Sequence, residues 1–248
     1  MFSLCAALPA RAQDPSPEPA DTSRGVRLYR QGDTKGAVEV LRGVVERDRT
    51  DADAWHYFGL ALEREGDPAG AARALEQAAR LRLRRFAWVN PSASRKGDFS
   101  VHLDERFADA AESLEKYLEL NPDAAGAWRE RLEAVRFYAR FYGQKKDDGQ
   151  KKGDARRDAY SPEEVTEPAV ILEKPEPAVQ KKQHPGGSWE VVVLLVTLAA
   201  DGQVRHVVTI QHESPAYTRA AVEAARRLKF KPAKKGRRPV SVVQQLTY

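Results

Sequence analysis

The chain has 248 residues, of which 31% are charged and 8% aromatic, so it is long enough for two ordinary domains. This composition excludes wholesale disorder, and a formal charge of +5 gives no argument for nucleic acid as a partner. No uncharged apolar run is long enough to cross a bilayer, so we expect no transmembrane segment in the sequence given.

Residues 1–12 have the features of a shortened signal peptide. An apolar start is followed by Ala10-Arg11-Ala12, which has the small-x-small form of a signal-peptidase site. The basic n-region is missing, so we expect the true start upstream of Met1; the alternative is an ordinary N-terminal tail. Cleavage at that site removes Cys5, the only cysteine, and leaves no thiolate for a disulfide or a metal. These features predict export to a bacterial periplasm, with a flexible lead-in over residues 13–20.

Residues 21–142 contain an internal repeat with a spacing of 34 residues, as from Gly25 to Gly59. The other pairs in register are Leu28 and Leu62, Arg30 and Arg64, Gly32-Asp33 and Gly66-Asp67, Ala37 and Ala71, and Leu41 and Leu75. This pattern resembles the tetratricopeptide repeat (TPR), which has the same period. The resemblance implies antiparallel helical hairpins that touch at the small residues.

A third repeat is half present, because residues 110–122 match only the second helix of the family pattern and its terminal proline. The place of the first helix is taken by an irregular insertion over residues 86–103, which is rich in turn formers. A final amphipathic helix over residues 124–142 is expected to cover the open end of the stack, since a repeat cannot bury its apolar face alone.

The TPR resemblance also implies a concave groove that binds protein or peptide partners. The groove positions by family pattern are Tyr29, Arg30, His56, Leu60, Glu63 and Arg64. Two alternatives stay open: the repeats act only as a spacer, or Trp88 and Phe99 of the insertion fill the groove.

Residues 143–185 are predicted to be a linker. The first part is a mixed run of Lys, Arg, Asp and Gly with no large aliphatic residue, and the second is rich in Pro and Glu. One apolar island, Ala169–Leu172, interrupts it and could form a short edge strand on the next domain.

Residues 186–248 are predicted to form a small β-β-α-β domain. Two β-type runs flank Asp201-Gly202, a pair that suits a tight turn. Ser214-Pro215 has the form of a helix start, and Pro232 is expected to end the helical region. A strand over residues 240–248 closes the chain. The first run, from Val191, is apolar on both faces, which predicts that its outer face is covered. The fold class is therefore a helical array followed by an α+β domain.

The phrase from Ala220 to Ala233, Ala-Ala-Val-Glu-Ala-Ala-Arg-Arg-Leu-Lys-Phe-Lys-Pro-Ala, and the closing strand resemble the C-terminal domain of TonB-family proteins. The resemblance implies a periplasmic domain that binds extended peptides by strand addition, for example a segment of an outer-membrane transporter. The docking edge is then Val240, Ser241, Val242, Val243, Gln244, Gln245, Leu246 and Thr247. The alternative is that the apolar island or a second copy of the chain covers this edge, the latter making a homodimer.

The chain departs from TonB in having no membrane helix to contact a motor complex, so we expect it not to transduce proton-motive force by itself. A basic rim follows the last helix, comprising Arg226, Arg227, Lys229, Lys231, Lys234, Lys235, Arg237 and Arg238. This rim suits a solvated surface or contact with peptidoglycan; nucleic acid is not expected, because stacking aromatics are lacking. The five histidines lack metal-ligand spacing, and no catalytic or cofactor motif is present, so no enzyme, metal or cofactor is predicted.

The sequence thus predicts a periplasmic adaptor that joins a TPR scaffold to a TonB-like peptide-binding domain. The alternatives are an envelope-structural protein that rests on peptidoglycan and a cytoplasmic scaffold of the same fold.

Overall fold

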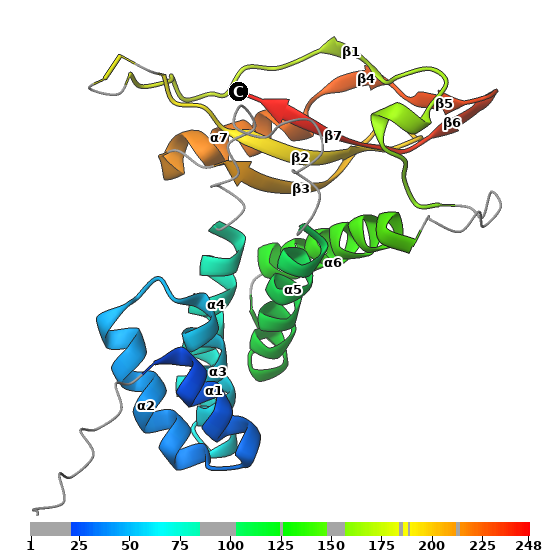
Figure 1. Cartoon of the computed structure of the whole chain (residues 1–248). Coiled ribbons are helices and arrows are strands. Elements are labelled where there is room, and N and C mark those ends of the chain that lie inside the picture. Colours follow the sequence, from blue (N-terminus) through cyan, green and yellow to red (C-terminus); the bar gives the residue numbers. More distant parts are fainter. Residues whose placement is uncertain are drawn as a thin grey trace, which may run out of the picture.

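The computed structural model describes residues 21–84, 103–124, 126–147, 157–183, 186–187, 189–211 and 214–248. Its N-terminal part is helical and its C-terminal part is rich in strands (Figure 1). The predicted signal peptide and lead-in lie outside the described residues. So do nearly all of the insertion, including Trp88 and Phe99, and residues 148–156 of the linker.

The helical part consists of helices that follow one another as antiparallel neighbours. They are α1 (Thr22–Gln31), α2 (Thr34–Arg47), α3 (Ala52–Arg64), α4 (Pro68–Arg84), α5 (Leu103–Leu120) and α6 (Gly126–Asp147). Each of α1 to α5 packs against the helix that comes next in the chain.

The first two hairpins have the same local geometry. At both turns a glycine has positive φ, 87° at Gly32 and 84° at Gly66, a conformation that side chains disfavour. The aspartate that follows each glycine caps the second helix: Asp33 accepts from the Gly36 amide at 2.9 Å, and Asp67 from the Gly70 amide at 2.8 Å. The internal repeat in the sequence therefore corresponds to a repeated hairpin.

Helix α5 contains the residues predicted as half a repeat, and it is not a lone second helix. It packs against both α4 and α6, so α5 and α6 make a third hairpin. Ala110 and Leu114 of α5 are fully buried in this packing. The helix α6 runs to Asp147, so residues 143–147 are helical where the sequence predicts linker.

The C-terminal part is built on a three-stranded antiparallel sheet in the order β3-β2-β7. Its strands are β2 (Val193–Leu198), β3 (Val204–Gln211) and β7 (Val242–Thr247), with α7 (Pro215–Arg226) between β3 and β7 in the chain. Gly202 has φ of 84° in the predicted turn, and the Ser214 side chain caps α7. The β-β-α-β order of the prediction is present in these elements.

Two further strand pairs were not predicted. The strand β1 (Val170–Glu173) pairs with β4 (Lys229–Lys231), and β5 (Ala233–Lys235) pairs with β6 (Arg238–Val240). The expectation that Pro232 ends the helical region is wrong, because α7 already ends at Arg226 and β4 precedes the proline.

Much of the predicted linker belongs to the C-terminal part. A short 3-10 helix, η3 (Pro162–Glu164), lies beside β7, and β1 holds the apolar island against β4 (Figure 1). The main chain of Glu167 exchanges hydrogen bonds with Lys234. The island is therefore an edge strand, and it covers β4, not β7.

The central strand β2 is buried at every position because helices cover both faces of the sheet. Its inner-face residues Leu194, Val196 and Leu198 share a core with α7. On the other face, Val193 and Leu195 share a core with Phe137, Tyr138 and other residues of α6. Figure 1 shows α6 lying across this outer face. The prediction that the outer face is covered is confirmed, and the cover is the last helix of the helical part.

Candidate peptide-binding surfaces

The outer edge of β7, the side turned away from β2, is the first candidate surface. Val192 and Tyr248 exchange main-chain hydrogen bonds of 3.1 and 2.9 Å. In an antiparallel pair, residues bonded to the neighbouring strand alternate with residues whose main-chain groups point away from it, so this pair fixes which residues of β7 bond to β2. The main-chain groups of Leu246, Gln244 and Val242, at every second position before Tyr248, therefore also bond to β2. The main-chain groups of Val243, Gln245 and Thr247 point to the outer edge.

The chain itself covers the beginning of this edge. The amide of Tyr160 donates to the carbonyl of Ser241, and the amide of Val243 donates to the carbonyl of Tyr160, both at 2.9 Å. Tyr160 thus makes a parallel bridge with β7 at Val242. Near the other end, Lys174 Nζ donates to the carbonyl of Thr247 at 2.5 Å.

Between these two contacts the described residues leave the outer edge of β7 unpaired. Within the described residues no strand pairs with the main chain of Gln245 or with the amide of Thr247, and both side chains are exposed. Of the other predicted edge residues, Val242, Val243 and Leu246 are buried, whereas Ser241 and Gln244 are half-buried. Val240 belongs to β6 and pairs with Ala233. The accessible docking edge is consequently shorter than the predicted 240–247.

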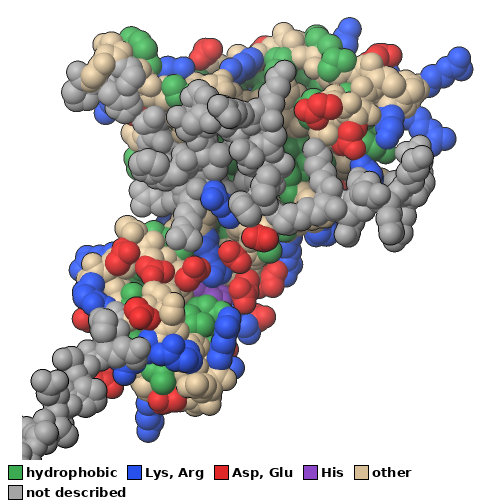
Figure 2. All heavy atoms as spheres, in the orientation of Figure 1, with side chains coloured by type: hydrophobic (Ala, Val, Ile, Leu, Met, Phe, Trp, Pro, Cys, Tyr) green, Lys and Arg blue, Asp and Glu red, His purple; other side chains and the backbone are tan. Residues whose placement is uncertain are grey.

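The second candidate surface is a pocket of about 640 Å³ on the helical part, which we call the concave pocket. It is lined by one face of α1, with Thr22, Val26 and Arg30, and by residues of α3, α4 and α5. Its opposing walls differ in charge, because Arg27 and Arg30 come from α1, whereas Asp109 and Glu112 come from α5. Figure 2 shows acidic side chains gathered on the side of this face nearer the sheet, with a basic group below them.

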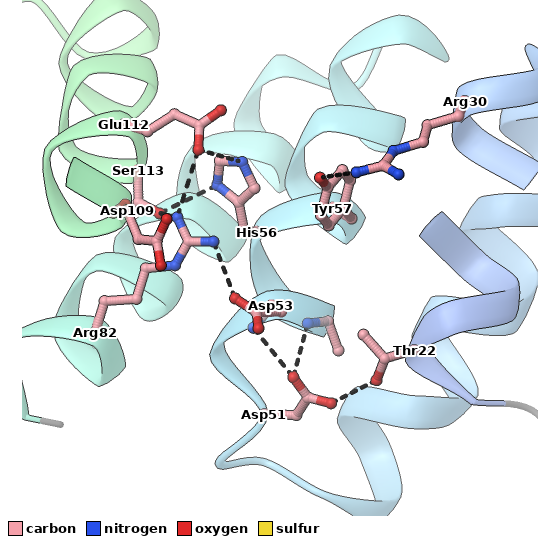
Figure 3. Close-up of polar contacts among 11 residues, drawn as sticks. Thr22, Arg30, Asp51, Asp53, His56, Tyr57, Arg82, Asp109, Glu112 and Ser113 are labelled. Carbon is pink, nitrogen blue, oxygen red and sulfur yellow. Dashed lines mark hydrogen bonds and ion pairs between the residues drawn. The ribbon is translucent and has the colours of Figure 1, made fainter. Parts of the chain in front are cut away.

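A buried arginine ties the pocket walls together (Figure 3). Arg82 of α4 is 6% exposed and donates to the Asp109 carbonyl at 2.6 Å, to Ser113 Oγ at 2.8 Å and to Asp53 Oδ1 at 3.0 Å. A buried guanidinium is tolerated when its donors are satisfied in this way, although Nε has no partner among the described residues. Arg82 therefore fixes α5 relative to α3.

His56 lies behind the pocket, not on its surface. It is 1% exposed, and its Nδ1 lies 3.1 Å from Ser113 Oγ. Burial, helped by the nearby charge of Arg82, lowers the pKa of His56 to about 3, so the imidazole is neutral and Glu112 at 3.5 Å is not an ion-pair partner at neutral pH. The assignment of His56 to the groove surface is wrong, because its ring is buried against the side chains of Ser113 and Glu112 of α5.

Of the other predicted groove residues, only Arg30 lines the concave pocket. Arg30 lines the pocket and its guanidinium donates to Tyr57 Oη at 3.4 Å. Arg64 lies over the ring of Tyr29, 3.9 Å from its centroid, and that ring packs edge-on against Tyr57. Tyr29, Leu60, Glu63 and Arg64 are not among the lining residues. The sequence does not point to Asp53, Tyr57, Asp109 and Glu112 as pocket residues. The last two lie on α5, which the repeat pattern matches to a second helix.

The basic rim is partly neutralised. Arg226 pairs with Glu130 of α6 at 2.5 Å, Lys229 with Glu173 at 2.7 Å, and Lys234 with Glu167 at 2.9 Å. Lys235 lies 4.4 Å from the centroid of the Tyr160 ring. Arg227, Lys231, Arg237 and Arg238 are exposed. The rim is thus a set of contacts to earlier segments interspersed with solvated cations, not a continuous basic surface.

Residues 177–248 match the family described as Gram-negative bacterial TonB protein C-terminal. This supports a TonB C-terminal domain in the last part of the chain, and we call it the TonB-like domain. No curated protein matches the chain.

Two solved structures similar to part of the chain are those of the type III secretion translocator chaperone SycD from Yersinia enterocolitica. One has 17% identity and a TM-score of 0.26, and covers 51% of this chain and 83% of SycD. The other, in complex with a peptide of the translocator YopD, has 18% identity and a TM-score of 0.26, and covers 50% of this chain and 91% of that chain. In the part of this chain that the structure describes, no helix is long and apolar enough to cross a membrane.

Proposed function

We propose that the protein is a periplasmic protein-interaction adaptor. Its TonB-like domain binds an extended peptide by strand addition at the outer edge of β7, and its TPR-like helical part holds a second protein in the concave pocket. The family match, the repeated hairpins and the predicted signal peptide support this proposal. The partner strand is a segment of another envelope protein, such as an outer-membrane transporter. The proposal assigns the chain no catalytic role.

The observation that carries the proposal is the open main chain of Gln245. Its amide and carbonyl point away from β2, on the edge strand of a TonB-like domain, and its side chain is exposed. An incoming strand gains main-chain hydrogen bonds there without disturbing the sheet. The alternate side chains Gln245 and Thr247 lie on one face of β7 and would contact the partner.

The experiment uses two substitutions at this position. Purified full-length protein selects binders from a displayed library of short random peptides. Gln245→Pro removes the outward amide but breaks no hydrogen bond to β2. An edge strand tolerates proline at such a position. Gln245→Ala keeps the amide and serves as the matched control.

We expect Gln245→Pro to weaken binding of the selected peptides about tenfold or more, since one main-chain hydrogen bond and the strand alignment are lost. Gln245→Ala should change it less than about threefold. Equal binding to the proline variant and the wild type would show that the peptides do not add to β7.

Contact with peptidoglycan through the basic rim is the weaker function, because three of its cations already have carboxylate partners within the chain. Sedimentation of the wild type with purified cell-wall polymer tests it, and charge reversal at Arg227 and Arg238 should then abolish co-sedimentation.

A further inference from the structure

This inference rests on the proposed strand addition at β7 and concerns what controls access to that edge. Residues 159–161, here called the strap, lie alongside the first half of β7. The strap bonds to the edge through a single residue, Tyr160, which accepts from Val243 and donates to Ser241. These are the main-chain groups that a partner strand would use.

The strap is held in place at both ends. Ala159 is 4% exposed and belongs to the core shared by α6 and the sheet, whereas Tyr160 is 8% exposed with Lys235 against its ring. Ser161 donates through its amide and hydroxyl to Glu164, at 2.8 and 2.7 Å, and Glu164 also pairs with Arg157 at 2.7 Å. The strap is therefore an ordered part of the fold.

A partner strand longer than the strap can make more main-chain hydrogen bonds to this edge than the strap does. It can use the two groups that Tyr160 holds, and in addition the carbonyl of Val243, both main-chain groups of Gln245 and the amide of Thr247. The open positions adjoin the covered ones, so a partner can begin pairing at Gln245 before the strap leaves. Strand displacement then proceeds one residue at a time along β7.

We infer that the strap is a built-in competitor for the peptide site: a partner strand docks on Gln245 and Thr247 first, and then displaces Tyr160 from Val243. The edge is consequently protected from unspecific strand pairing while no partner is present. Peptides too short to reach Val243 bind weakly, because they gain only the open positions.

Hydrogen exchange of the full-length wild type tests the inference without any ligand. A displaceable strap opens locally, so the amide of Val243 should exchange about tenfold or more faster than that of Leu246, which is bonded to β2. Low concentrations of urea should leave the Val243 rate unchanged. If both amides exchange at the same rate and with the same urea dependence, the strap opens only on global unfolding and the inference is wrong.

A peptide measurement completes the test. Tyr160→Pro removes the amide that bonds to Ser241, and Tyr160→Phe keeps both the amide and the ring. Peptides selected on the wild type should bind the proline variant about tenfold more tightly, because the competitor is weakened, and the phenylalanine variant equally well. Equal affinity for all three proteins overturns the inference. If no peptide binds any of them, the proposed function fails, and the hydrogen-exchange rates still decide whether the strap is displaceable.

Discussion

The hydroxyl of Tyr138 donates a 2.6 Å hydrogen bond to the main-chain carbonyl of His206 and thereby joins α6 to β3. His206 has φ of 50°, rare for a residue with a side chain, and its ring stacks on Phe137 with 4.0 Å between centroids. Burial also raises the pKa of Tyr138 well above its usual value, so the hydroxyl stays a donor. The hydrogen bond from Tyr138 and the stacking of His206 on Phe137 thus join the helical part to the TonB-like domain.

The first prediction concerns this contact. Tyr138→Phe leaves the half-buried main-chain carbonyl of His206 without its hydroxyl partner and should lower the free energy of unfolding by about 1–3 kcal/mol. Urea denaturation measures it. Tyr117→Phe is the control, because the ring of Tyr117 keeps its packing on Trp128. Equal stabilities of the two variants would mean that the Tyr138 hydroxyl contributes nothing to the contact.

The second prediction compares the two faces of β2. Leu194 faces α7 and Leu195 faces α6, and they are 0% and 2% exposed. Because both faces are covered, Leu194→Ala and Leu195→Ala should each cost about 2–5 kcal/mol in urea unfolding. A cost below about 1 kcal/mol for Leu195→Ala alone would indicate that α6 does not cover the outer face in solution.

The third prediction concerns close packing within the helical hairpins. A Cβ at Gly59 would lie 2.7 Å from Leu75, so Gly59→Ala should destabilise the protein by about 1–3 kcal/mol through overpacking. Gly143→Ala is the control, since a Cβ there meets nothing within 4 Å and alanine favours the helix by up to about 1 kcal/mol. Thermal unfolding should move the two variants in opposite directions, and a neutral Gly59→Ala would contradict the packing.

The fourth prediction is a pH dependence that comes from His56. Its pKa is lowered from 6.5 to about 3 by burial, so the unfolded chain takes up a proton at a pH where the folded chain does not. The stability from the neutral imidazole is full above pH 6.5 and falls by about 1.4 kcal/mol per pH unit between 6.5 and 3.

The matched variant for this prediction is His56→Gln, which cannot titrate. Between pH 7 and pH 5, urea unfolding of the wild type should lose about 2 kcal/mol more stability than this variant does. An equal loss in both proteins would show that His56 is protonated or exposed in the folded state.

The sequence predicts those features that depend on local chemistry. The turns at Gly32 and Gly66 follow from glycine and aspartate in fixed positions, and the start of α7 follows from Ser214-Pro215. The apolar character of both faces of β2 correctly predicts a cover. In each case the residues that cause the structure lie next to one another or recur with a simple period.

The remaining features depend on contacts between distant segments. The sequence around Tyr160 does not reveal that it pairs with β7, because one residue makes the contact and its partner lies at Val242. The burial of His56 depends on Ser113 of α5, whose position relative to α3 is set by Arg82. The identity of the helix that covers β2 likewise depends on tertiary packing of α6, since periodicity alone shows only that α6 is amphipathic.

The addition of a partner strand to β7 is tested most directly by N-methylation along a bound peptide. Only every second amide of an edge-bound strand faces the protein, so methylation at alternate positions should weaken binding about tenfold, with little effect between them. Isothermal titration calorimetry with full-length protein measures each peptide. A loss of affinity without this period of two would contradict strand addition at the β7 edge.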